Sequence, residues 1–210
     1  MEFLENKTIA IRRKTLEMIS QVGSGHPGGS LSCAEILITL YFHIMNIDPS
    51  NPSWKDRDRF ILSKGHAAPA LYATLAERGF FSLENQKPLR SLESNLQGHP
   101  DRHRLPGVDV STGSLGNGLS IGLGIALAGK VNNQEYKTYV LLGDGECNEG
   151  LVWEAAMAAS HYKLENLIAV IDRNGLQIDG PTEKVMGLEP LARKWESFGW
   201  NVLQVDGHNV

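Results

Sequence analysis

The sequence has few of the features that mark specialised classes of protein. Only two of its 210 residues are cysteines, Cys33 and Cys147, and they are not spaced as a pair. This scarcity argues against a disulfide framework and a structural zinc site and favours a reducing compartment. The 20 basic and 24 acidic residues give a formal net charge of −4, which provides no general attraction to nucleic acid or to an anionic membrane surface. We therefore expect neither as a partner.

Long apolar runs and targeting signals are lacking as well. The most apolar stretch, residues 119–129, is interrupted by Gly122 and Gly124 and is far too short to span a membrane. The N-terminus, residues 1–5, is acidic and has neither the basic region nor the apolar core of a signal peptide. With 41% hydrophobic and 21% charged residues, the composition is typical of a folded globular chain rather than a disordered one. A cytoplasmic location is predicted.

The order of the remaining patterns indicates the fold class. Residues 138–142 and 167–171 are short, continuous apolar runs, typical of strands covered on both faces of a parallel sheet, and residues 201–205 are predicted as a third strand. Helical patterns near 150–162 and 188–198 separate the three strands. This alternation predicts an α/β fold with a doubly wound, mostly parallel sheet and helices on both faces. No repeat and no Pro-, Gly- or Ser-rich linker divides the chain, so one domain is expected.

Three further helices are predicted in the first half of the chain. They comprise residues 4–22, a segment opened by the capping-box spacing of residues 32–35, and a segment framed by Pro69 and Gly79. The second of these is apolar nearly all round, so it is expected to be buried, with His43 in the core or at an interface. Residues 84–107 form a long polar segment without periodicity, which is predicted to be a functional or mobile loop.

The strongest chemical signal stands at the ends of two predicted strands. Asp144 lies between glycines after one strand, and Asn174 follows the next, so both are expected at the same edge of the sheet, where open α/β folds bind ligands. A carboxylate and an amide oxygen are hard ligands of the kind that Mg²⁺ or Ca²⁺ prefers, and the turn after Asn174 would allow the carbonyl of Leu176 to join them. The flanking glycines allow backbone N–H groups to approach a phosphate. The alternative is two ordinary turns without a ligand.

Among the histidines that directly follow glycine, three lie in predicted loops well inside the chain: His26, His66 and His99. A neutral imidazole donates or accepts a proton near neutral pH, which suits proton transfer and the recognition of hydroxyl groups. Two alternatives stay open. The three histidines could be ordinary loop residues, or they could bind zinc in a metal hydrolase, although none of them shows the i, i+4 spacing of a helical metal site.

A loop rich in small residues precedes a helix that also consists mainly of small residues. Residues 111–118 read Ser-Thr-Gly-Ser-Leu-Gly-Asn-Gly, so Leu115 projects from a segment whose backbone can be approached closely. The helix after it is predicted to pack tightly on a neighbour, but that packing does not explain the loop. A Rossmann dinucleotide site and a P-loop are disfavoured, because neither G-x-G-x-x-G nor G-x-x-x-x-G-K-[ST] occurs.

Taken together, these segments resemble the thiamine-diphosphate-binding N-terminal domain of transketolase over nearly the whole chain. The resemblance is carried, in chain order, by SGHPGGSLSCAEIL, SKGHAAPALYA, QGHP, STGSLGNGLS, GDGECNEG with the following WEA, and DRNGLQIDG. It implies a thiamine-diphosphate-binding fold, with thiamine diphosphate and Mg²⁺ (or Ca²⁺) as cofactors. It further implies transfer of a two-carbon ketol unit from a ketose phosphate to an aldose phosphate.

The resemblance also implies which residues contact the cofactors. Gly145 matches a backbone donor to the diphosphate, and Leu115 belongs to the loop that holds the cofactor in its bent form. The residues that match cofactor contacts are His66, Gly113, Ser114, Leu115, Asp144, Gly145, Asn174 and Ile178. Those that match metal ligands are Asp144, Asn174 and the carbonyl of Leu176.

Three more residues match catalytic positions. His26 and His99 match histidines that meet the hydroxyl groups of the substrate, and His26 is also a candidate for proton transfer. Glu149 matches an acidic residue at the dimer interface, in a network that reaches the partner's cofactor-activating glutamate. The resemblance therefore implies that the active site is completed by a second chain.

Two parts of the family pattern are missing from residues 1–210. One is the pyrimidine-binding domain, with the glutamate that activates the cofactor ring. The other is a later segment of the first domain with a further cofactor-facing histidine, which His208 does not match. We therefore expect a single diphosphate-binding domain that lacks its C-terminal portion. It would be the N-terminal subunit of a split transketolase, paired with a separate C-terminal subunit in a hetero-tetramer of two plus two chains.

Two other functions remain open at this point. One is a subunit of another thiamine-diphosphate enzyme, of the dihydroxyacetone or deoxyxylulose-phosphate synthase type. The other is a non-catalytic pseudo-subunit that binds the cofactor without turnover. The sequence indicates no sugar-phosphate specificity, because no arginine cluster stands out.

Overall fold

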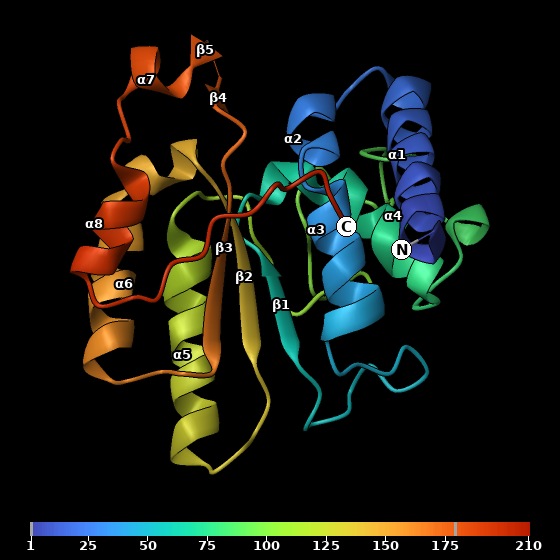
Figure 1. The fold of residues 1–210 in the computed structure, drawn as a ribbon. Coiled ribbons are helices and arrows are strands. Elements are labelled where there is room, and N and C mark those ends of the chain that lie inside the picture. Colours follow the sequence, from blue (N-terminus) through green and yellow to red (C-terminus); the bar gives the residue numbers. More distant parts are fainter. Residues whose placement is uncertain (1, 179) are drawn as a thin grey trace. The chain divides into compact units, whose positions relative to one another are not determined.

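The computed structural model describes residues 2–178 and 180–210 (Figure 1). The chain divides into two compact units. The helical unit comprises Met1–Asp58, Gly65–Gly113 and Asp206–Val210, and the sheet unit comprises Arg59–Lys64 and Ser114–Val205. The chain thus enters each unit more than once, and each unit combines residues from distant parts of the sequence.

Helices and turns make up the helical unit in the described residues. They are α1 (Glu2–Val22), α2 (Pro27–Leu31), α3 (Ala34–Thr39), the π-helical turn η1 (Leu40–Ile44), the 3-10 turn η2 (Gly65–Ala67), α4 (Ala68–Arg78) and the 3-10 turn η3 (Leu83–Asn85). Helix α1 packs against α3 and α4. Helix α4 has the predicted ends, since Pro69 lies in its first turn and Gly79 ends it with a φ of 99°, a left-handed conformation that suits glycine.

The helix predicted after residue 32 begins and ends differently from the expectation. Ser32 continues the right-handed turn of α2, where its hydroxyl donates to the carbonyl of Gly29, and α3 begins after Cys33; the Glu35 carboxylate binds Arg12. His43 is exposed, so it does not lie in the core, and the interface remains as its expected place. The wider π-helical turn at 40–44 changes the angular position of its residues, and Ile44 is exposed whereas Met45 is buried.

The long segment 84–107 is held in place by its leucines. Apart from the short turn η3, it contains no helix or strand among the described residues. Leu89, Leu96 and Leu105 are nevertheless buried, so the loop has apolar anchors along its length. These anchors explain how a mostly polar segment holds a defined path.

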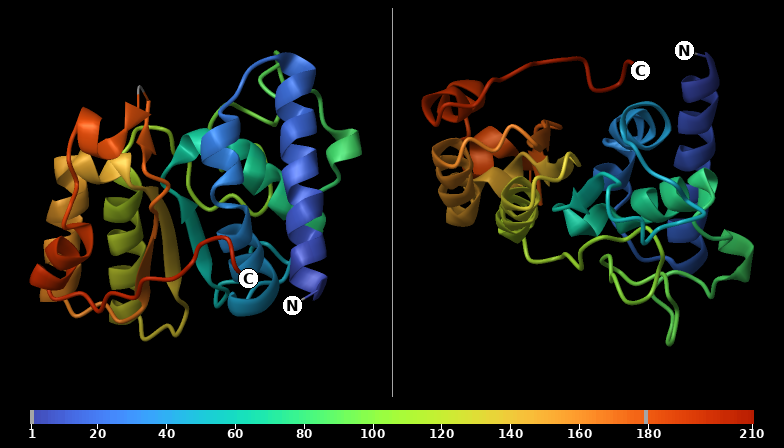
Figure 2. Two further views of the ribbon diagram at one scale, coloured as in Figure 1. Left: turned by 45° about the horizontal axis from the view of Figure 1, so that its top comes forward. Right: turned by 90° about the horizontal axis from the view of Figure 1, so that it is seen from below.

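The sheet unit is built on three parallel strands in the order β1-β2-β3 (Figures 1 and 2). These are β1 (Arg59–Leu62), β2 (Thr138–Gly143) and β3 (Leu167–Asp172). The other elements are α5 (Asn117–Val131), the 3-10 turn η4 (Gly145–Asn148), α6 (Gly150–His161), β4 (Leu176–Gln177) paired with β5 (Gly180–Pro181), α7 (Thr182–Val185) and α8 (Leu191–Ser197). The predicted α/β class with a parallel sheet is confirmed, and β2 and β3 each extend one residue beyond their predicted ends.

One predicted strand is wrong, and one real strand has no clear signal in the sequence. Residues 201–205 are not a strand, and Leu203 and Val205 are 82% and 86% exposed. A strand forms only where it can pair with another strand, and no strand among the described residues pairs with residues 201–205. Strand β1 is not predicted because its apolar run, Phe60–Leu62, is too short to distinguish from a helical turn.

Helix α5 lies against all three strands because its glycines permit close approach. A Cβ atom on Gly122 would lie 2.5 Å from Cγ2 of Val140, and one on Gly118 would lie 2.3 Å from Oγ of Ser63. The predicted small-residue helix is thus confirmed, and its purpose is tight packing on the sheet.

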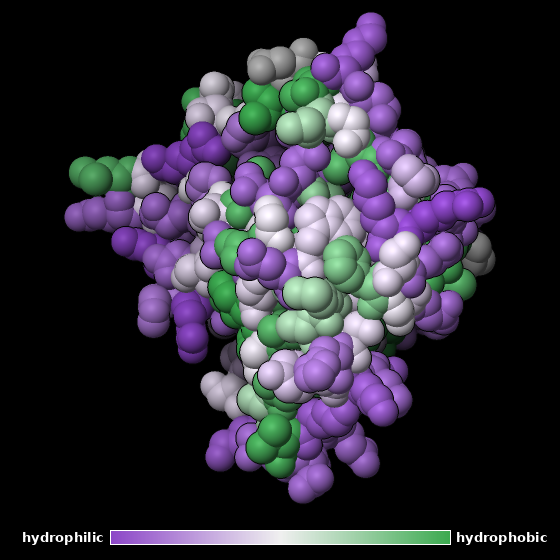
Figure 3. Space-filling view, turned by 90° about the vertical axis from the view of Figure 1, so that its left-hand side faces the viewer, coloured by the Kyte–Doolittle hydropathy of each residue, from purple (hydrophilic) through white to green (hydrophobic). Residues whose placement is uncertain are grey.

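On the side of Figure 1 that carries α6 and α8, apolar and polar residues are interspersed (Figure 3).

Candidate functional site

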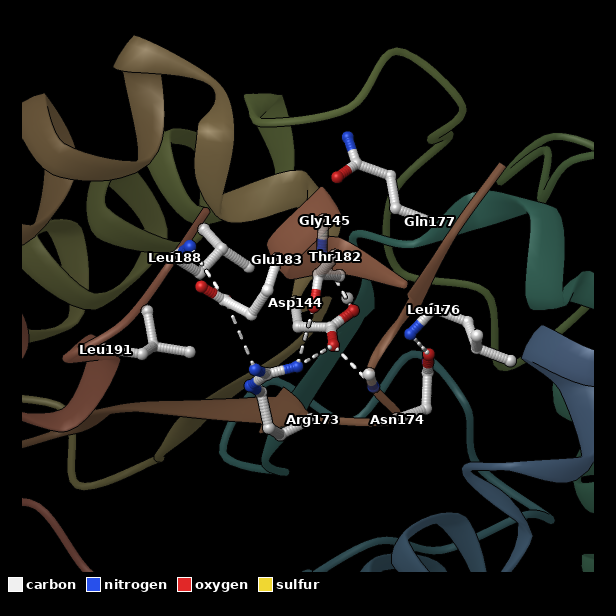
Figure 4. Close-up of polar contacts among 12 residues, drawn as sticks. Asp144, Gly145, Arg173, Asn174, Leu176, Gln177, Thr182, Glu183, Leu188 and Leu191 are labelled. Carbon is white, nitrogen blue, oxygen red and sulfur yellow. Dashed lines mark hydrogen bonds and ion pairs between the residues drawn. The ribbon is translucent and has the colours of Figure 1, made fainter. Parts of the chain in front are cut away.

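The carboxyl ends of β2 and β3 meet at one edge of the sheet, as the sequence predicts. Gly143 pairs with Asp172, and the backbone N–H of Asp144 donates to the carbonyl of Asp172 at 3.1 Å. The turn 173–175 therefore begins beside Asp144. Figure 4 shows Asp144 and Asn174 at this edge.

The carboxylate of Asp144 joins the turns that follow the two strands. It is only 1% exposed. Its Oδ1 accepts the backbone N–H of Gly145 at 2.8 Å, and its Oδ2 accepts the N–H of Gly175 at 2.7 Å and Nη1 of Arg173 at 2.8 Å. A buried carboxylate needs such donors and a counter-charge to offset the loss of hydration. The arrangement therefore fixes Asp144 in one position at the sheet edge.

The neighbouring residues of the predicted ligand set are more exposed. Asn174 Oδ1 accepts the backbone N–H of Leu176 at 2.9 Å, which closes a local turn (Figure 4). The side chains of Leu176 and Ile178 are 65% and 94% exposed. Burial within this chain thus does not account for these two apolar side chains.

The donor set at the sheet edge fits a divalent cation. Oδ1 of Asp144 accepts one hydrogen bond from the described residues, and a carboxylate oxygen has room for two. The carboxylate, the Asn174 amide oxygen and a backbone carbonyl are the hard oxygen ligands that Mg²⁺ and Ca²⁺ take. A cation already lies against Oδ2, because Nη1 of Arg173 is 2.8 Å from it.

Arg173 is a site residue that the sequence patterns did not single out. Its guanidinium also contacts Glu189 at 2.9 Å and Glu183 at 3.5 Å. Partial burial lowers the pKa of Arg173, but its hydrogen bonds to Glu189 and Asp144 raise the pKa by more, so the net shift is upward. Arg173 is therefore a permanent cation among three carboxylates. The sequence signal that could have identified Arg173 is its position directly before Asn174.

A buried ion pair links the two outer strands near the same edge. Lys64 lies two residues after the end of β1, Asp172 ends β3, and their side chains form a salt bridge. The Lys64 side chain is fully buried and that of Asp172 is 6% exposed. Because β2 lies between β1 and β3, this pair ties the carboxyl ends of the sheet together across the central strand.

Glu146 is a second buried carboxylate that the patterns did not single out. It accepts the hydroxyl of Ser63, the backbone N–H of Gly116 at 2.8 Å and the backbone N–H of Gly143 at 3.0 Å. Burial raises the pKa of Glu146, and the three donors act against that rise. The carboxylate thus connects the ends of β1 and β2 to the loop that precedes α5.

The loop that carries Ser114 and Leu115 is held by glycine geometry as well. Gly116 has a φ of 83°, and a Cβ atom there would lie 2.7 Å from Cβ of Glu149. Asn117 Nδ2 donates to the carbonyl of Ser114 at 3.2 Å and to its hydroxyl at 3.0 Å. Leu115 is half-buried and Glu149 is exposed. These residues lie together in the sheet unit.

His26, His66 and His99 gather in the helical unit. The rings of His26 and His66 pack edge to face, with centroids 5.5 Å apart. A Cβ atom on Gly113 would lie 3.0 Å from Cγ of His99, and one on Gly65 would lie 2.9 Å from the backbone nitrogen of Gly113. The loop 111–113 thus packs against the histidine turns at distances that only glycine permits.

The surroundings of His99 favour the neutral imidazole. Partial burial lowers the pKa of His99, and the charges of Arg90 and His26 lower it further. Arg90 donates from Nη1 to the hydroxyl of Ser24 at 3.0 Å, and a Cβ atom on Gly98 would lie 3.0 Å from its Nε. Arg90 therefore bridges the two histidine-bearing loops. Nothing in the local sequence links residue 90 to residue 24, so the sequence did not indicate this role.

The zinc-hydrolase alternative has no geometric support. Within residues 2–178 and 180–210, no group of three or more His, Cys, Asp or Glu is placed to hold a metal ion. Among the same residues, no helix has the length and apolar character needed to cross a membrane.

Residues 5–210 match the family model of the transketolase thiamine-diphosphate-binding domain. Among known proteins, the chain is 49% identical to one of the subunits of the apulose-4-phosphate transketolase of Phocaeicola vulgatus, over all of this chain and 74% of that protein. It is also 49% identical to the 6-deoxy-6-sulfo-D-fructose transketolase subunit SqwG of a Clostridium species, over 99% of this chain and 75% of that protein.

Solved structures show the same likeness. The structure is similar to that of transketolase from Campylobacter jejuni, with a TM-score of 0.92 and 33% identity. The match covers all of this chain and 34% of the other. The chain therefore spans about three quarters of the subunit relatives and about one third of that solved chain.

Proposed function

Because the chain belongs to the transketolase family and is its thiamine-diphosphate-binding domain, we propose that it is the cofactor-binding subunit of a two-subunit transketolase. The reaction is the transfer of a two-carbon ketol unit from a ketose phosphate to an aldose phosphate. The partner is a C-terminal subunit with the pyrimidine-binding domain, in an assembly of two plus two chains. The observation that carries the proposal is the buried Asp144 carboxylate, which joins the turns after β2 and β3 at the edge where Asn174 lies.

In this proposal the sheet edge holds the metal and the diphosphate. Asp144, Asn174 and the carbonyl of Leu176 would bind Mg²⁺ or Ca²⁺, and the backbone N–H of Gly145 would donate to the diphosphate. Thiamine diphosphate, when bound, supplies the carbon nucleophile that takes up the two-carbon unit. The residues assigned to contacts with the rest of the cofactor are His66, Gly113, Ser114, Leu115 and Ile178.

The remaining assigned residues act on the substrate and on the partner. His26 and His99 would bind sugar hydroxyl groups, and His26 would also move a proton. The lowered pKa of His99 supports this role, because a neutral imidazole both donates and accepts a hydrogen bond. Glu149 is exposed, as a residue that contacts a partner chain must be.

Reconstitution tests the proposed function directly. The chain is co-expressed with its C-terminal partner, and ketol transfer is measured with xylulose 5-phosphate and ribose 5-phosphate, with and without thiamine diphosphate and Mg²⁺. Apulose 4-phosphate and 6-deoxy-6-sulfofructose extend the panel, because two relatives are named for them. We expect transfer that depends on both cofactors. Condensation of pyruvate with glyceraldehyde 3-phosphate instead would assign a deoxyxylulose-phosphate synthase, and no cofactor binding with the partner present would leave a pseudo-subunit.

His26→Ala is expected to reduce kcat of the assembled enzyme by about a hundredfold, the usual contribution of a positioned acid or base. The affinity for thiamine diphosphate is expected to stay unchanged, because His26 is assigned to the substrate. Steady-state kinetics and calorimetric titration of the cofactor measure the two effects. His43→Ala removes an exposed histidine of the same unit and serves as the control. Equal turnover of the His26 variant and the control would show that His26 is an ordinary loop residue.

A further inference from the structure

The guanidinium of Arg173 lies between one buried and two exposed carboxylates. Nη1 donates to Asp144 Oδ2 at 2.8 Å and to the Thr182 hydroxyl at 3.0 Å, whereas Nε and Nη2 donate to Glu189 Oε1 at 3.2 and 2.9 Å. Nη2 also lies 3.5 Å from Glu183 Oε1 (Figure 4). One edge of the guanidinium thus faces the proposed metal ligand, and the rest of it faces the two glutamates.

The three carboxylates differ sharply in their need for a counter-charge. The Asp144 side chain is 1% exposed, while those of Glu183 and Glu189 are 48% and 53% exposed. A buried carboxylate without a cation carries a large desolvation cost, whereas an exposed one is stabilised by water. Arg173 therefore has its largest effect at Asp144, although it makes more contacts with Glu189.

From this arrangement we infer that Arg173 is an internal stand-in for the divalent ion. It neutralises Asp144 while the metal is absent, and it moves onto Glu183 and Glu189 when the metal binds. This inference rests on the proposed function, since it assumes that Asp144 is a metal ligand. It adds a regulatory role for a residue whose own side chain binds neither the metal nor the cofactor.

The two states exclude one another for electrostatic reasons. A guanidinium and a divalent ion on the same carboxylate would be separated by a few ångströms and would repel strongly in a partly buried site. The ion would take the open position on Oδ1, and its charge would displace Nη1 from Oδ2. The carboxylate keeps its place meanwhile, because the backbone N–H groups of Gly145 and Gly175 still hold it.

The second position of Arg173 is already prepared. Glu183 Oε1 accepts the backbone N–H of Leu188 at 2.9 Å, and Glu189 Oε2 accepts that of Leu191 at 2.9 Å. Both glutamates are thus oriented by the backbone before the metal arrives. Arg173 keeps its Nε and Nη2 contacts with Glu189 during the change and gives up only those of Nη1. The movement requires a side-chain rotation and no rearrangement of the strands.

Loss of the Arg173 guanidinium is predicted to strengthen the binding of a divalent ion. Mn²⁺ is the probe: it is titrated into the purified chain, and again into the complex co-expressed with the partner, and electron paramagnetic resonance measures the free Mn²⁺. Arg173→Gln is expected to bind Mn²⁺ about tenfold more tightly than wild type, because no guanidinium has to be displaced. Glu189→Gln is expected to bind it roughly threefold more weakly, since Arg173 then has a poorer second position.

Stability gives a readout that does not depend on the bound ion. Without metal, Arg173→Gln is expected to melt at a lower temperature than wild type, because Asp144 has lost its counter-charge. Saturating Mn²⁺ is expected to remove that difference. Arg193→Gln makes the same change of charge on α8 and is expected to leave both measurements unchanged. Arg173→Lys, a milder change, should lie between wild type and the glutamine variant, because one ammonium cannot bridge Asp144 and Glu189 as the guanidinium does.

The outcomes separate this inference from the proposed function. If Asp144→Asn abolishes Mn²⁺ binding but neither Arg173 variant binds the ion more tightly, the stand-in role is refuted and the metal site survives. If wild-type binding does not depend on Asp144, the proposed metal site fails, and the stand-in role fails with it. Tighter binding in both Arg173 variants, together with loss of binding in Asp144→Asn, supports both.

Discussion

Asp144→Asn is expected to weaken Mg²⁺-dependent binding of thiamine diphosphate by about a hundredfold or more. Asp144 is the only charged residue in the proposed ligand set, and loss even of residues that merely orient metal ligands costs about 10- to 100-fold in affinity. An amide contributes one oxygen without a negative charge, so it attracts a divalent ion far less. Calorimetric titration of thiamine diphosphate with and without Mg²⁺ measures the loss.

The structure adds a cost in stability that the measurement must take into account. Both carboxylate oxygens accept backbone N–H groups, from Gly145 and Gly175, and an asparagine would turn its own N–H₂ group towards one of these donors. An unsatisfied buried donor of this kind costs about 1–3 kcal/mol. The titration therefore belongs at a temperature at which circular dichroism shows the variant folded.

Asp48→Asn is the matched control for this experiment. Asp48 also accepts a backbone N–H, from Ser50 at 2.9 Å, but it is exposed and belongs to the helical unit. The control makes the same change of charge and should keep full Mg²⁺-dependent binding. If Asp144→Asn kept it too, the sheet edge would not be the metal site, and the diphosphate would have to bind elsewhere.

The elements that the sequence predicts well are those whose signal is local. Strands β2 and β3 are continuous apolar runs, and the pairing of Gly143 with Asp172 places Asp144 beside the turn of Asn174 as expected. Helix α4 carries its own start and end signals in Pro69 and Gly79. In each case a few consecutive residues suffice for the prediction, because the interactions that decide the structure lie within the element.

The elements that escape prediction depend on residues far apart in the chain. Glu146 meets Ser63 and Lys64 meets Asp172 only after the strands have assembled, and no periodicity links such positions. The opposite error has the same origin, since residues 201–205 have the composition of a strand but pair with no strand among the described residues. The parts of the site that sequence reasoning missed are therefore its charge partners, and not its backbone turns.

Lys64→Met is expected to lower the free energy of unfolding by about 3–5 kcal/mol, the cost of removing one member of a buried ion pair. The variant leaves the Asp172 carboxylate, 6% exposed, without its cation. Because Asp172 immediately precedes Arg173, the effect falls on the sheet edge that holds Asp144. Urea unfolding measures the loss of stability. Lys130→Met, which removes an exposed lysine that bonds to two backbone carbonyls, should cost under about 1 kcal/mol.

The double variant Lys64→Met with Asp172→Leu shows what the charge pair contributes. Replacing both members of a buried pair with apolar side chains of similar size is often neutral, because the desolvation cost disappears together with the attraction. We therefore expect the double variant to be more stable than Lys64→Met alone. If it is less stable than the single variant, Lys64 and Asp172 are not each other's main interaction partners. If it is more stable but no longer binds the cofactor, the pair matters for the shape of the sheet edge, since it ties β1 to β3 across the strand that leads to Asp144.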